Sequence, residues 1–295
     1  MSWVRVAPNC LFFSRLQMTL LEVLRSSTEY FTKREIENPR LNAELLLAHS
    51  LGKKRIELYL DFERALSEEE LVPIRELLRR RAQGEPLQHL VGTVEFIGRE
   101  FVCDKRALVP RPETEELVEF LKSAIRNPQS AILDVGTGSG VIVISLALIF
   151  PEARLTAVDV SDDALALAKE NSARFGLGER IQFVKGDLLS DLPGQFDAIV
   201  ANLPYVGLAD RNTLAREVLH DPEVALFGGE KGDELVRKLI ENAPASLLPN
   251  GLLALEIGLG QAEALRALLE AKNYHDIESK NDYSGITRFL FARYG

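Results

Sequence analysis

The chain has 295 residues, of which 46% are hydrophobic and 27% are charged. This is the composition of an ordinary globular protein, and it excludes wholesale disorder. The length suits one large domain or two unequal ones. A net charge of −9 disfavours a protein that coats a nucleic-acid backbone without sequence specificity.

Charge is distributed unevenly along the chain. Residues 1–83 hold 14 basic and 12 acidic side chains, whereas the remainder holds 21 basic and 32 acidic ones. This asymmetry predicts a domain boundary near residue 83.

The cysteines and the apolar runs indicate where the protein works. Cys10 and Cys103 lie far apart, without a Cys-x-x-Cys motif, so we expect neither a disulfide scaffold nor a metal site. Such cysteine usage is typical of a reducing compartment, and we expect a cytoplasmic protein. The longest apolar run, Val141 to Phe150, is too short to cross a bilayer.

The first seventeen residues differ in character from the rest of the chain. They carry Arg5 and Arg15, no acidic residue and only a short apolar stretch at Cys10–Phe13. No small-residue cleavage pattern comes after this stretch, so for residues 1–17 we favour a disordered extension over a targeting segment.

Residues 18–83 are predicted to form a small all-α domain. Apolar residues recur there at helical spacing, and no alternating pattern typical of strands occurs. The four predicted helices start near Leu20, Asn38–Pro39, Lys54 and Ser67. Ser67 and Glu70 have the spacing of a capping box, and the last helix is expected to stop before Gly84.

Residues 84–110 are predicted to form a linker. Gly84 and Pro86 break the preceding helix, and apolar residues then alternate on both sides of Gly98. This pattern predicts a β-hairpin.

Residues 111–295 alternate between predicted strands and helices. Strands are expected at Ala131–Val135, Arg154–Asp159, Ile181–Lys185, Phe196–Ala201, Gly251–Ile257, His275–Ser279 and Ile286–Ala292. Helices are expected around Glu116–Ile125, Val141–Leu148, Asp162–Arg174, Glu234–Leu247 and Gln261–Glu270. The fold class is therefore α/β: a doubly wound, seven-stranded and mostly parallel sheet that ends in an antiparallel hairpin.

The first strand of this domain runs into a glycine-rich turn and an apolar helix. The turn contains Gly136, Thr137, Gly138, Ser139 and Gly140. Glycines tolerate positive φ and let a ligand approach the backbone, while the helix start offers unpaired N–H groups. The glycines are spaced by two throughout, which differs from the G-x-G-x-x-G fingerprint of dinucleotide-binding proteins.

The next two strand ends carry acidic residues. Asp159 ends the second strand, where a carboxylate accepts hydrogen bonds from both ribose hydroxyls of a nucleoside. Asp187 and Leu188 follow the third strand. Asp187 suits an adenine amino group with Leu188 over the ring, although a helix N-cap explains Asp187 equally well. As a set, these residues resemble the cofactor site of class-I S-adenosylmethionine-dependent methyltransferases.

The fourth strand ends in the tetrapeptide Asn202-Leu203-Pro204-Tyr205. To methylate an amide nitrogen, a site must hold its hydrogens and aim its lone pair at the methyl group. The Asn202 side-chain carbonyl and the Leu203 main-chain carbonyl can accept hydrogen bonds from the two N–H groups. The Leu203 backbone is held extended because Pro204 follows it. Tyr205 can pack a planar group against its ring.

The tetrapeptide resembles the Asn-Pro-Pro-Tyr signature of methyltransferases that act on planar nitrogen, with Leu203 in place of the usual proline. The signature implies that Asn202, Leu203, Pro204 and Tyr205 bind substrate and take part in catalysis, and that Asn202 also lies against the cofactor. The contact implied at Leu203 is made by its main-chain carbonyl, which a leucine supplies as well as a proline does. The departure from the signature therefore affects the rigidity of the segment and not the contact itself.

Other segments are similar to the release factor glutamine methyltransferases, the PrmC/HemK family. These segments are Pro86-Leu87-Gln88, Val109 to Glu115, Arg216 to Leu219, Asp221-Pro222, Gly228-Gly229 and Glu256-Ile257-Gly258 with Gln261. The resemblance spans about residues 18–295. It implies methyl transfer from S-adenosylmethionine to the side-chain N5 of the glutamine in the Gly-Gly-Gln loop of class-I peptide-chain release factors, docked in part by the helical domain.

Two alternatives stay open at this point. One is a methyltransferase that acts on an adenine or guanine amine of nucleic acid through the same tetrapeptide. The other is a catalytically silent cofactor-binding partner protein, which Leu203 favours.

Several titratable residues receive no chemical role from the sequence. The histidines are scattered, and we expect structural or surface roles for His49, His89, His220 and His275. Glu113 and Glu115 suit either the mouth of the site or the start of a helix.

Overall fold

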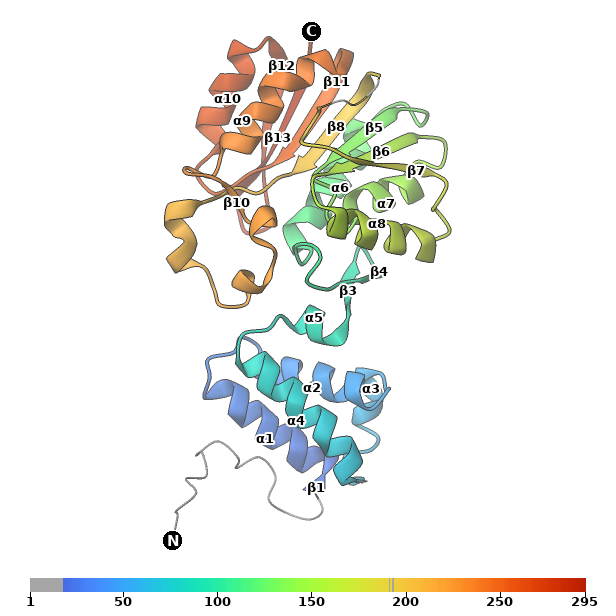
Figure 1. Ribbon diagram of the computed structural model, residues 1–295, viewed down its shortest axis with the longest axis vertical. Helices are drawn as coiled ribbons and strands as arrows, with labels where there is room; N and C mark the ends of the chain where they lie inside the picture. The colour runs from blue at the N-terminus through green and yellow to red at the C-terminus, as the bar shows by residue number, and fades with distance from the viewer. Residues whose placement is uncertain (1–17, 191, 193) are drawn as a thin grey trace. The chain divides into compact units, whose positions relative to one another are not determined.

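The computed structural model describes residues 18–190, 192 and 194–295. The extension predicted for residues 1–17 lies outside them. The chain divides into two compact units between Val91 and Gly92 (Figure 1), and each unit has its own apolar core.

The first unit is helical, as the sequence predicts. Its helices are α1 (Leu20–Thr32), α2 (Pro39–Ser50), α3 (Arg55–Leu58), α4 (Glu68–Ala82) and α5 (Leu87–Val91). It also holds an antiparallel ladder of two residues per strand, β1 (Met18–Thr19) with β2 (Ala65–Leu66). The sequence analysis predicted no strand there and no helix at α5, because elements this short contain too few residues for a periodic signal.

Capping boxes start two of these helices. The Thr19 and Glu22 side chains each bond the other residue's backbone N–H at the start of α1. At the start of α4, the Glu70 N–H donates to Ser67 Oγ at 3.3 Å and the Ser67 N–H donates to Glu70 Oε2 at 2.9 Å. The sequence prediction for Ser67 and Glu70 is confirmed.

The predicted hairpin opens the second unit. Strands β3 (Thr93–Phe96) and β4 (Arg99–Val102) pair antiparallel around a two-residue turn, in which Ile97 and Gly98 both have positive φ. Positive φ at both central residues gives the turn the same twist as the paired strands of a tight hairpin. Phe96 and Phe101 meet edge to face at 6.0 Å between ring centroids and are buried in the core of the second unit.

The second unit contains a seven-stranded sheet in the order β12-β13-β11-β8-β5-β6-β7 (Figure 1). Its strands are β5 (Ala131–Val135), β6 (Arg154–Asp159), β7 (Ile181–Lys185), β8 (Phe196–Asn202), β11 (Leu247–Glu256), β12 (Tyr274–Asn281) and β13 (Thr287–Tyr294). The five strands from β11 to β7 are parallel, and β13 pairs antiparallel with β11 and β12. The predicted doubly wound sheet with its final hairpin is confirmed.

Helices cover both faces of this sheet. They are α6 (Pro112–Ala124), α7 (Val141–Ile149), α8 (Asp162–Arg174), α9 (Glu234–Asn242) and α10 (Ala262–Ala271). Apolar residues of α6 and α7 pack on one face, and those of α9 and α10 pack on the other. The carboxyl ends of β5, β6, β7 and β8 therefore meet at one edge between two covered faces, where such folds bind ligands.

A small parallel pair, β9 (Val206–Gly207) with β10 (Phe227–Gly229), lies beyond β8. Between its strands the chain forms the short 3-10 helices η1 (Leu208–Thr213), η2 (Val218–His220) and η3 (Glu223–Ala225), and η4 (Ala243–Ala245) follows α9. The sequence analysis did not predict this pair, because two or three residues per strand show no alternation.

We expect the Ser67→Ala substitution to destabilise the start of α4 by about 1 kcal/mol, since it removes the acceptor for the Glu70 N–H. Amide hydrogen exchange in the first turn of α4, measured in the full chain, reports this loss of stability at the helix start itself. A local measurement is needed because the chain has two compact units. Ser26→Ala inside α1 is the matched control, because alanine is the better helix former there. Unchanged exchange in Ser67→Ala would contradict the assigned cap.

Candidate active site

A cavity of about 310 Å³ opens at the carboxyl ends of the parallel strands. This volume lies at the lower end of the range found for small-molecule sites, roughly 300–1,000 Å³. The walls come from residues 106–114, the glycine-rich turn, the ends of β6 to β8, and residues 222–225. Of the residues predicted for the site, the lining includes Gly136, Thr137, Gly138, Ser139, Asp159, Asp187, Leu188, Asn202, Leu203 and Pro204.

The glycine-rich turn forms a cradle that only small residues permit. Gly136 and Gly138 have φ values of +72° and +56°, in the left-handed region that favours glycine. A Cβ on Gly136 would lie 2.9 Å from Leu203 Cδ2. The end of β8 and the turn after β5 therefore pack directly against each other.

Gly140 is not among the lining residues, although its neighbours Ser139 and Val141 are. A Cβ there would lie 3.1 Å from both the Ala168 Cβ and the Ile144 Cδ1. The residue thus lets α7 pack closely on α8. Its predicted place among the cofactor-binding residues stays a prediction.

Asp159 lies on the cavity wall with both carboxylate oxygens engaged. Oδ2 accepts from the Gly138 N–H and Oδ1 from the Ser161 N–H, each at 2.9 Å. A carboxylate has about four acceptor sites, so capacity for a further donor remains. Burial raises the pKa of this carboxyl, whereas the backbone N–H groups of Ser161, Gly138 and Val160 favour its charged form.

The segment after β7 forms a turn rather than a helix, so the N-cap explanation for Asp187 finds no helix to cap. Asp187 is exposed and pairs with Lys238 Nζ of α9 at 2.6 Å. Leu188 has a φ of +55° and is buried against the second face of the sheet. This backbone conformation is costly for a leucine.

The tetrapeptide at the end of β8 is held from three sides. Leu203 is 4% exposed and packs in the apolar core beside Gly136. Gln261 Nε2 donates to the Tyr205 carbonyl at 3.1 Å, and its Oε1 accepts from the Gly258 N–H at 2.8 Å. A Cβ on Gly228 would overlap the Pro204 carbonyl. Burial of the Leu203 side chain fixes this residue without the ring that a proline would supply.

Tyr205 is half-buried and follows the lining residues without joining them. Burial and the nearby Glu256 raise the pKa of its hydroxyl. Its predicted ring contact with a planar substrate group stays a prediction.

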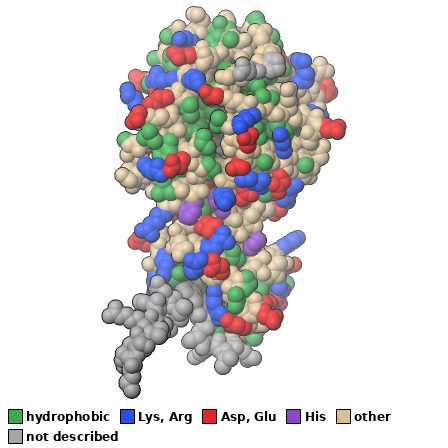
Figure 2. All heavy atoms as spheres, viewed as in Figure 1, with side chains coloured by type: hydrophobic (Ala, Val, Ile, Leu, Met, Phe, Trp, Pro, Cys, Tyr) green, Lys and Arg blue, Asp and Glu red, His purple; other side chains and the backbone are tan. Residues whose placement is uncertain are grey.

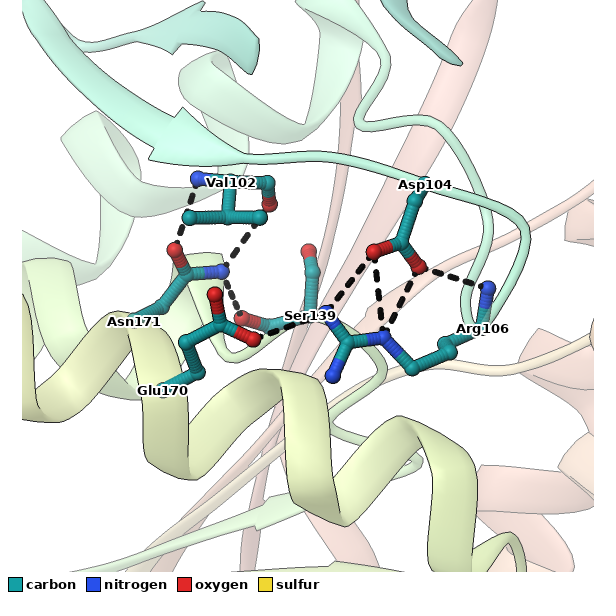
Figure 3. A network of polar contacts seen from close by, with 6 residues as sticks. All are labelled: Val102, Asp104, Arg106, Ser139, Glu170 and Asn171. Carbon is teal, nitrogen blue, oxygen red and sulfur yellow. Dashed lines mark hydrogen bonds and ion pairs between the residues drawn. The ribbon is translucent and has the colours of Figure 1, made fainter. Parts of the chain in front are cut away.

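The chain after β4 forms another wall of the cavity and is fixed by α8 (Figure 3). Asn171 is fully buried; its Oδ1 accepts from the Val102 N–H at 2.7 Å and its Nδ2 donates to the carbonyls of Val102 and Ser139. Arg106 bridges Asp104 and Glu170 a few residues further on. One asparagine therefore connects the hairpin to the glycine-rich turn.

A buried acid fixes the other end of this wall. Asp221 accepts from the Val109 N–H at 3.2 Å and from Arg111 Nη2 at 2.9 Å. Burial raises the pKa of Asp221 to about 6. Arg111 in turn lines the cavity.

Four further buried polar residues were not identified by the sequence analysis as part of the site. Asp134 is fully buried beneath the glycine-rich turn, accepts from Thr137 Oγ1 at 2.7 Å, and has its pKa raised to about 7 by burial. The other three are Thr114, Asn171 and Glu256. For Asp134 and Glu256 the signal in the sequence was an acidic residue at the end of an apolar strand, which identifies no partner. Thr114 and Asn171 lie among polar residues of α6 and α8 and gave no such signal.

The remaining titratable residues stay away from the cavity. Glu113 and Glu115 occupy the first turn of α6, where acidic residues favour the helix start. His220 and His275 are exposed. Within the described residues, no group of three or more His, Cys, Asp and Glu residues could hold a metal ion.

Among residues 18–190, 192 and 194–295, every helix falls short of the length and apolarity that crossing a bilayer requires.

The strand order, with its final antiparallel strand, is that of the class-I methyltransferase fold. The structure titled T. Thermophilus 16S rRNA N2 G1207 methyltransferase (RsmC), in complex with AdoMet and guanosine, shares this fold. It is 20% identical, has a TM-score of 0.50, and the match covers 69% of this chain and 50% of that one.

Sequence comparisons identify the family to which the chain belongs. The PrmC N-terminal domain family matches residues 22–92, and the methyltransferase small domain family matches residues 112–231. The release factor glutamine methyltransferase of Chlorobaculum tepidum is 41% identical, covering 92% of this chain and 96% of its own length. That of Deinococcus radiodurans is 40% identical, covering 94% and 99%. The chain belongs to the release factor glutamine methyltransferase family.

We expect Gly140→Ala to destabilise the second unit by more than the strain of positive φ alone. Its backbone has a φ of +82° and its Cβ would crowd Ala168 and Ile144. Gly176→Ala is the matched control, because its φ is +69° with nothing within 4 Å of the added Cβ. Overpacking should make Gly140→Ala the worse variant by about 1 kcal/mol or more in denaturant unfolding. Equal losses would refute the close packing of α7 on α8.

Proposed function

We propose that this protein transfers a methyl group from S-adenosylmethionine to the side-chain N5 of a glutamine in peptide-chain release factors. Seven curated relatives between 36% and 41% identical carry the name release factor glutamine methyltransferase. The observation that carries the proposal is that the Asn202-Leu203-Pro204 segment lines the same cavity as the glycine-rich turn. A cofactor and an amide would therefore share one enclosure.

The residues present fit the cofactor. In this proposal Gly136 to Ser139 approach it through the backbone, Asp159 accepts from its ribose, and Asp187 with Leu188 holds the adenine. Gly136, Thr137, Gly138 and Ser139 line the cavity, with positive φ at both glycines, and Asp159 keeps acceptor capacity beyond its backbone donors. When bound, S-adenosylmethionine supplies a methyl group on a sulfonium, which is a good leaving group.

Asn202 and Leu203 prepare the substrate nitrogen. A carboxamide nitrogen is a poor nucleophile because its lone pair is delocalised into the carbonyl. Oδ1 of Asn202 and the Leu203 main-chain carbonyl accept hydrogen bonds from the two N–H groups of this nitrogen. These two bonds fix the amide plane, so the lone pair of the nitrogen is aimed across the cavity. Tyr205 then packs against the amide plane. As the nitrogen forms its bond to the methyl carbon, the carbon–sulfur bond breaks, and the cationic nitrogen then releases one proton to water. An N-protonated amide is a strong acid, so this release does not depend on a strong base. Alignment of this kind supplies up to about 7–11 kcal/mol of a barrier.

The partner is proposed on the same grounds. A glutamine in the Gly-Gly-Gln loop of a class-I release factor has small neighbours, so its side chain can enter a narrow enclosure. The helical unit, which matches the PrmC N-terminal domain, is proposed to help dock the release factor.

Surface charge disfavours nucleic acid as the substrate. On the face shown in Figure 2, basic and acidic side chains are interspersed over the second unit. A net charge of −9 offers a phosphate backbone little attraction. The packing of Leu203 also weakens the argument for a catalytically silent protein, because the segment is fixed despite the missing proline.

Mass spectrometry of a release factor incubated with the protein and S-adenosylmethionine tests the proposal. We expect one added methyl group on the loop glutamine, and none on a release factor in which that glutamine is replaced by glutamate. A parallel incubation with RNA and DNA and labelled cofactor tests the nucleic-acid alternative. Label in nucleic acid, or no transfer to any substrate, would overturn the proposal.

We expect Asn202→Ala to lower kcat about a hundredfold or more, because the substrate nitrogen loses one of its two acceptors. Cofactor affinity, measured by calorimetry on the same sample, should stay largely intact. A kcat equal to that of the parent protein would remove Asn202 from the substrate site.

We expect Asp159→Ala to weaken cofactor binding, since it removes the proposed ribose acceptor and frees the Gly138 N–H. Calorimetric titration measures the change in Kd. Asp163→Ala is the matched control, because Asp163 is exposed in the first turn of α8. Equal Kd values for the two variants would reject the ribose assignment.

A further inference from the structure

Behind the tetrapeptide, three side chains from three elements form a hydrogen-bonded chain. Asn202 Nδ2, at the end of β8, donates to Thr114 Oγ1 in the first turn of α6 at 3.0 Å. Thr114 Oγ1 donates to Glu256 Oε2, at the end of β11, at 2.8 Å. Of the three, Thr114 and Asn202 line the cavity.

The backbone holds this chain in place. Glu256 and Asn202 are direct partners in the parallel pairing of β11 with β8. Thr114 is 3% exposed and Glu256 is 2% exposed. Because both side chains are buried, each must satisfy its hydrogen-bonding capacity inside the protein.

The chemistry of the three groups gives the chain a direction. An ionised carboxylate only accepts hydrogen bonds, so the Thr114 hydroxyl donates its one O–H to Glu256. Thr114 Oγ1 is then left with lone pairs, which suit the Asn202 NH₂ group and repel its Oδ1. If Thr114 turned its proton to Asn202 instead, a buried carboxylate would lose its donor, which is costly.

We propose that Thr114 and Glu256 are positioning residues, which orient the Asn202 carboxamide so that Nδ2 faces the protein and Oδ1 faces the cavity. The inference rests on the proposed function, in which Oδ1 accepts from the substrate amide. With the carboxamide turned over, an NH₂ group would face the substrate NH₂ group, and the two donors would repel each other.

The protonation state of Glu256 decides the direction of the chain. Several groups face this carboxyl: Thr114 and Glu113 from α6, Asn202 from β8 with Tyr205 beyond it, and Arg288 from β13. Burial, with a smaller contribution from Glu113, raises its pKa to about 7, against the opposing effects of Thr114, Arg288 and Asn202. Above that pH the carboxylate accepts from Thr114. Below it, a protonated Glu256 donates to Thr114, whose own proton then favours Asn202 Oδ1.

Turnover measurements on threonine variants form the first test. Thr114→Val keeps the shape and removes the hydroxyl, so kcat for release-factor methylation should fall on the order of tenfold to a hundredfold, with cofactor Kd unchanged. Thr114→Ser restores the hydroxyl and should recover most of the loss. Thr156→Val in β6, away from the chain, is the matched control.

The pH dependence forms the second test. The kcat/KM of the parent protein should fall as the pH drops through about 7, because the free enzyme then loses the orienting carboxylate. Asp134 and Asp221 also have raised pKa values, so the comparison with Glu256→Gln is decisive. The kcat/KM of Glu256→Gln should be lower than that of the parent protein, and its pH profile should lack the fall near pH 7 that Glu256 causes.

A readout without methyl transfer separates this inference from the proposed function. In protein labelled with ¹⁵N-asparagine, the Asn202 NH₂ resonance, assigned by its absence in Asn202→Ala, should be protected from exchange and should titrate near pH 7. The protection should be lost in Thr114→Val, and the titration should vanish in Glu256→Gln. An unprotected Asn202 NH₂ group, or equal kcat in Thr114→Val and the parent, would overturn the positioning role. Failure of the parent to methylate release factor, with the NMR behaviour intact, would overturn the proposed function alone.

Discussion

The parallel pairing of β8 with β5 on one side and β11 on the other is the constraint on which the site depends. In this register Ala201 lies beside Val135, just before the glycine-rich turn, and Asn202 lies beside Glu256. The backbone ladder thus brings a ligand cradle, a candidate substrate acceptor and a buried carboxylate to one edge. A slip of one residue would turn Asn202 to the opposite face of the sheet and separate the three.

Buried polar side chains hold the walls of the cavity. Asn171 satisfies three backbone groups of the hairpin and the glycine-rich turn (Figure 3), and Asp221 holds the chain that enters α6. Each of these groups would be costly to leave unpaired in the interior. These hydrogen bonds therefore fix the walls of the cavity to the sheet and the helices. A site that accelerates a reaction by aligning its reactants requires such fixed walls.

The sequence predicted those features that have a local cause. β5, β6 and β7 have the predicted bounds because strand-length apolar runs end at turn residues. The capping box at Ser67 is also as predicted, because its residues lie within one helical turn. The glycine-rich turn and Asn202 line one cavity, as the order of strands implied. The close packing of Gly140 against Ala168 could not be foreseen, because Ala168 comes from another helix.

Features that join distant segments escaped the sequence analysis for the same reason. Thr114 and Glu256 are 142 positions apart, and Val102 and Asn171 are 69 apart. Nothing in the local pattern of either residue identifies its partner. The pair β9 and β10 is likewise defined by long-range packing on the tetrapeptide, where glycines allow a close approach. Tertiary contacts of this kind complete a site whose main elements the local pattern already outlines.

The central claim is that two oxygens at the end of β8 hold the hydrogens of a carboxamide. A crystal structure of the protein with S-adenosylhomocysteine and a peptide containing Gly-Gly-Gln tests it most directly. The account predicts the glutamine nitrogen within about 3 Å of both Asn202 Oδ1 and the Leu203 carbonyl oxygen, with its lone pair aimed at the cofactor sulfur. A glutamine side chain bound elsewhere, or facing Asn202 Nδ2, would contradict it.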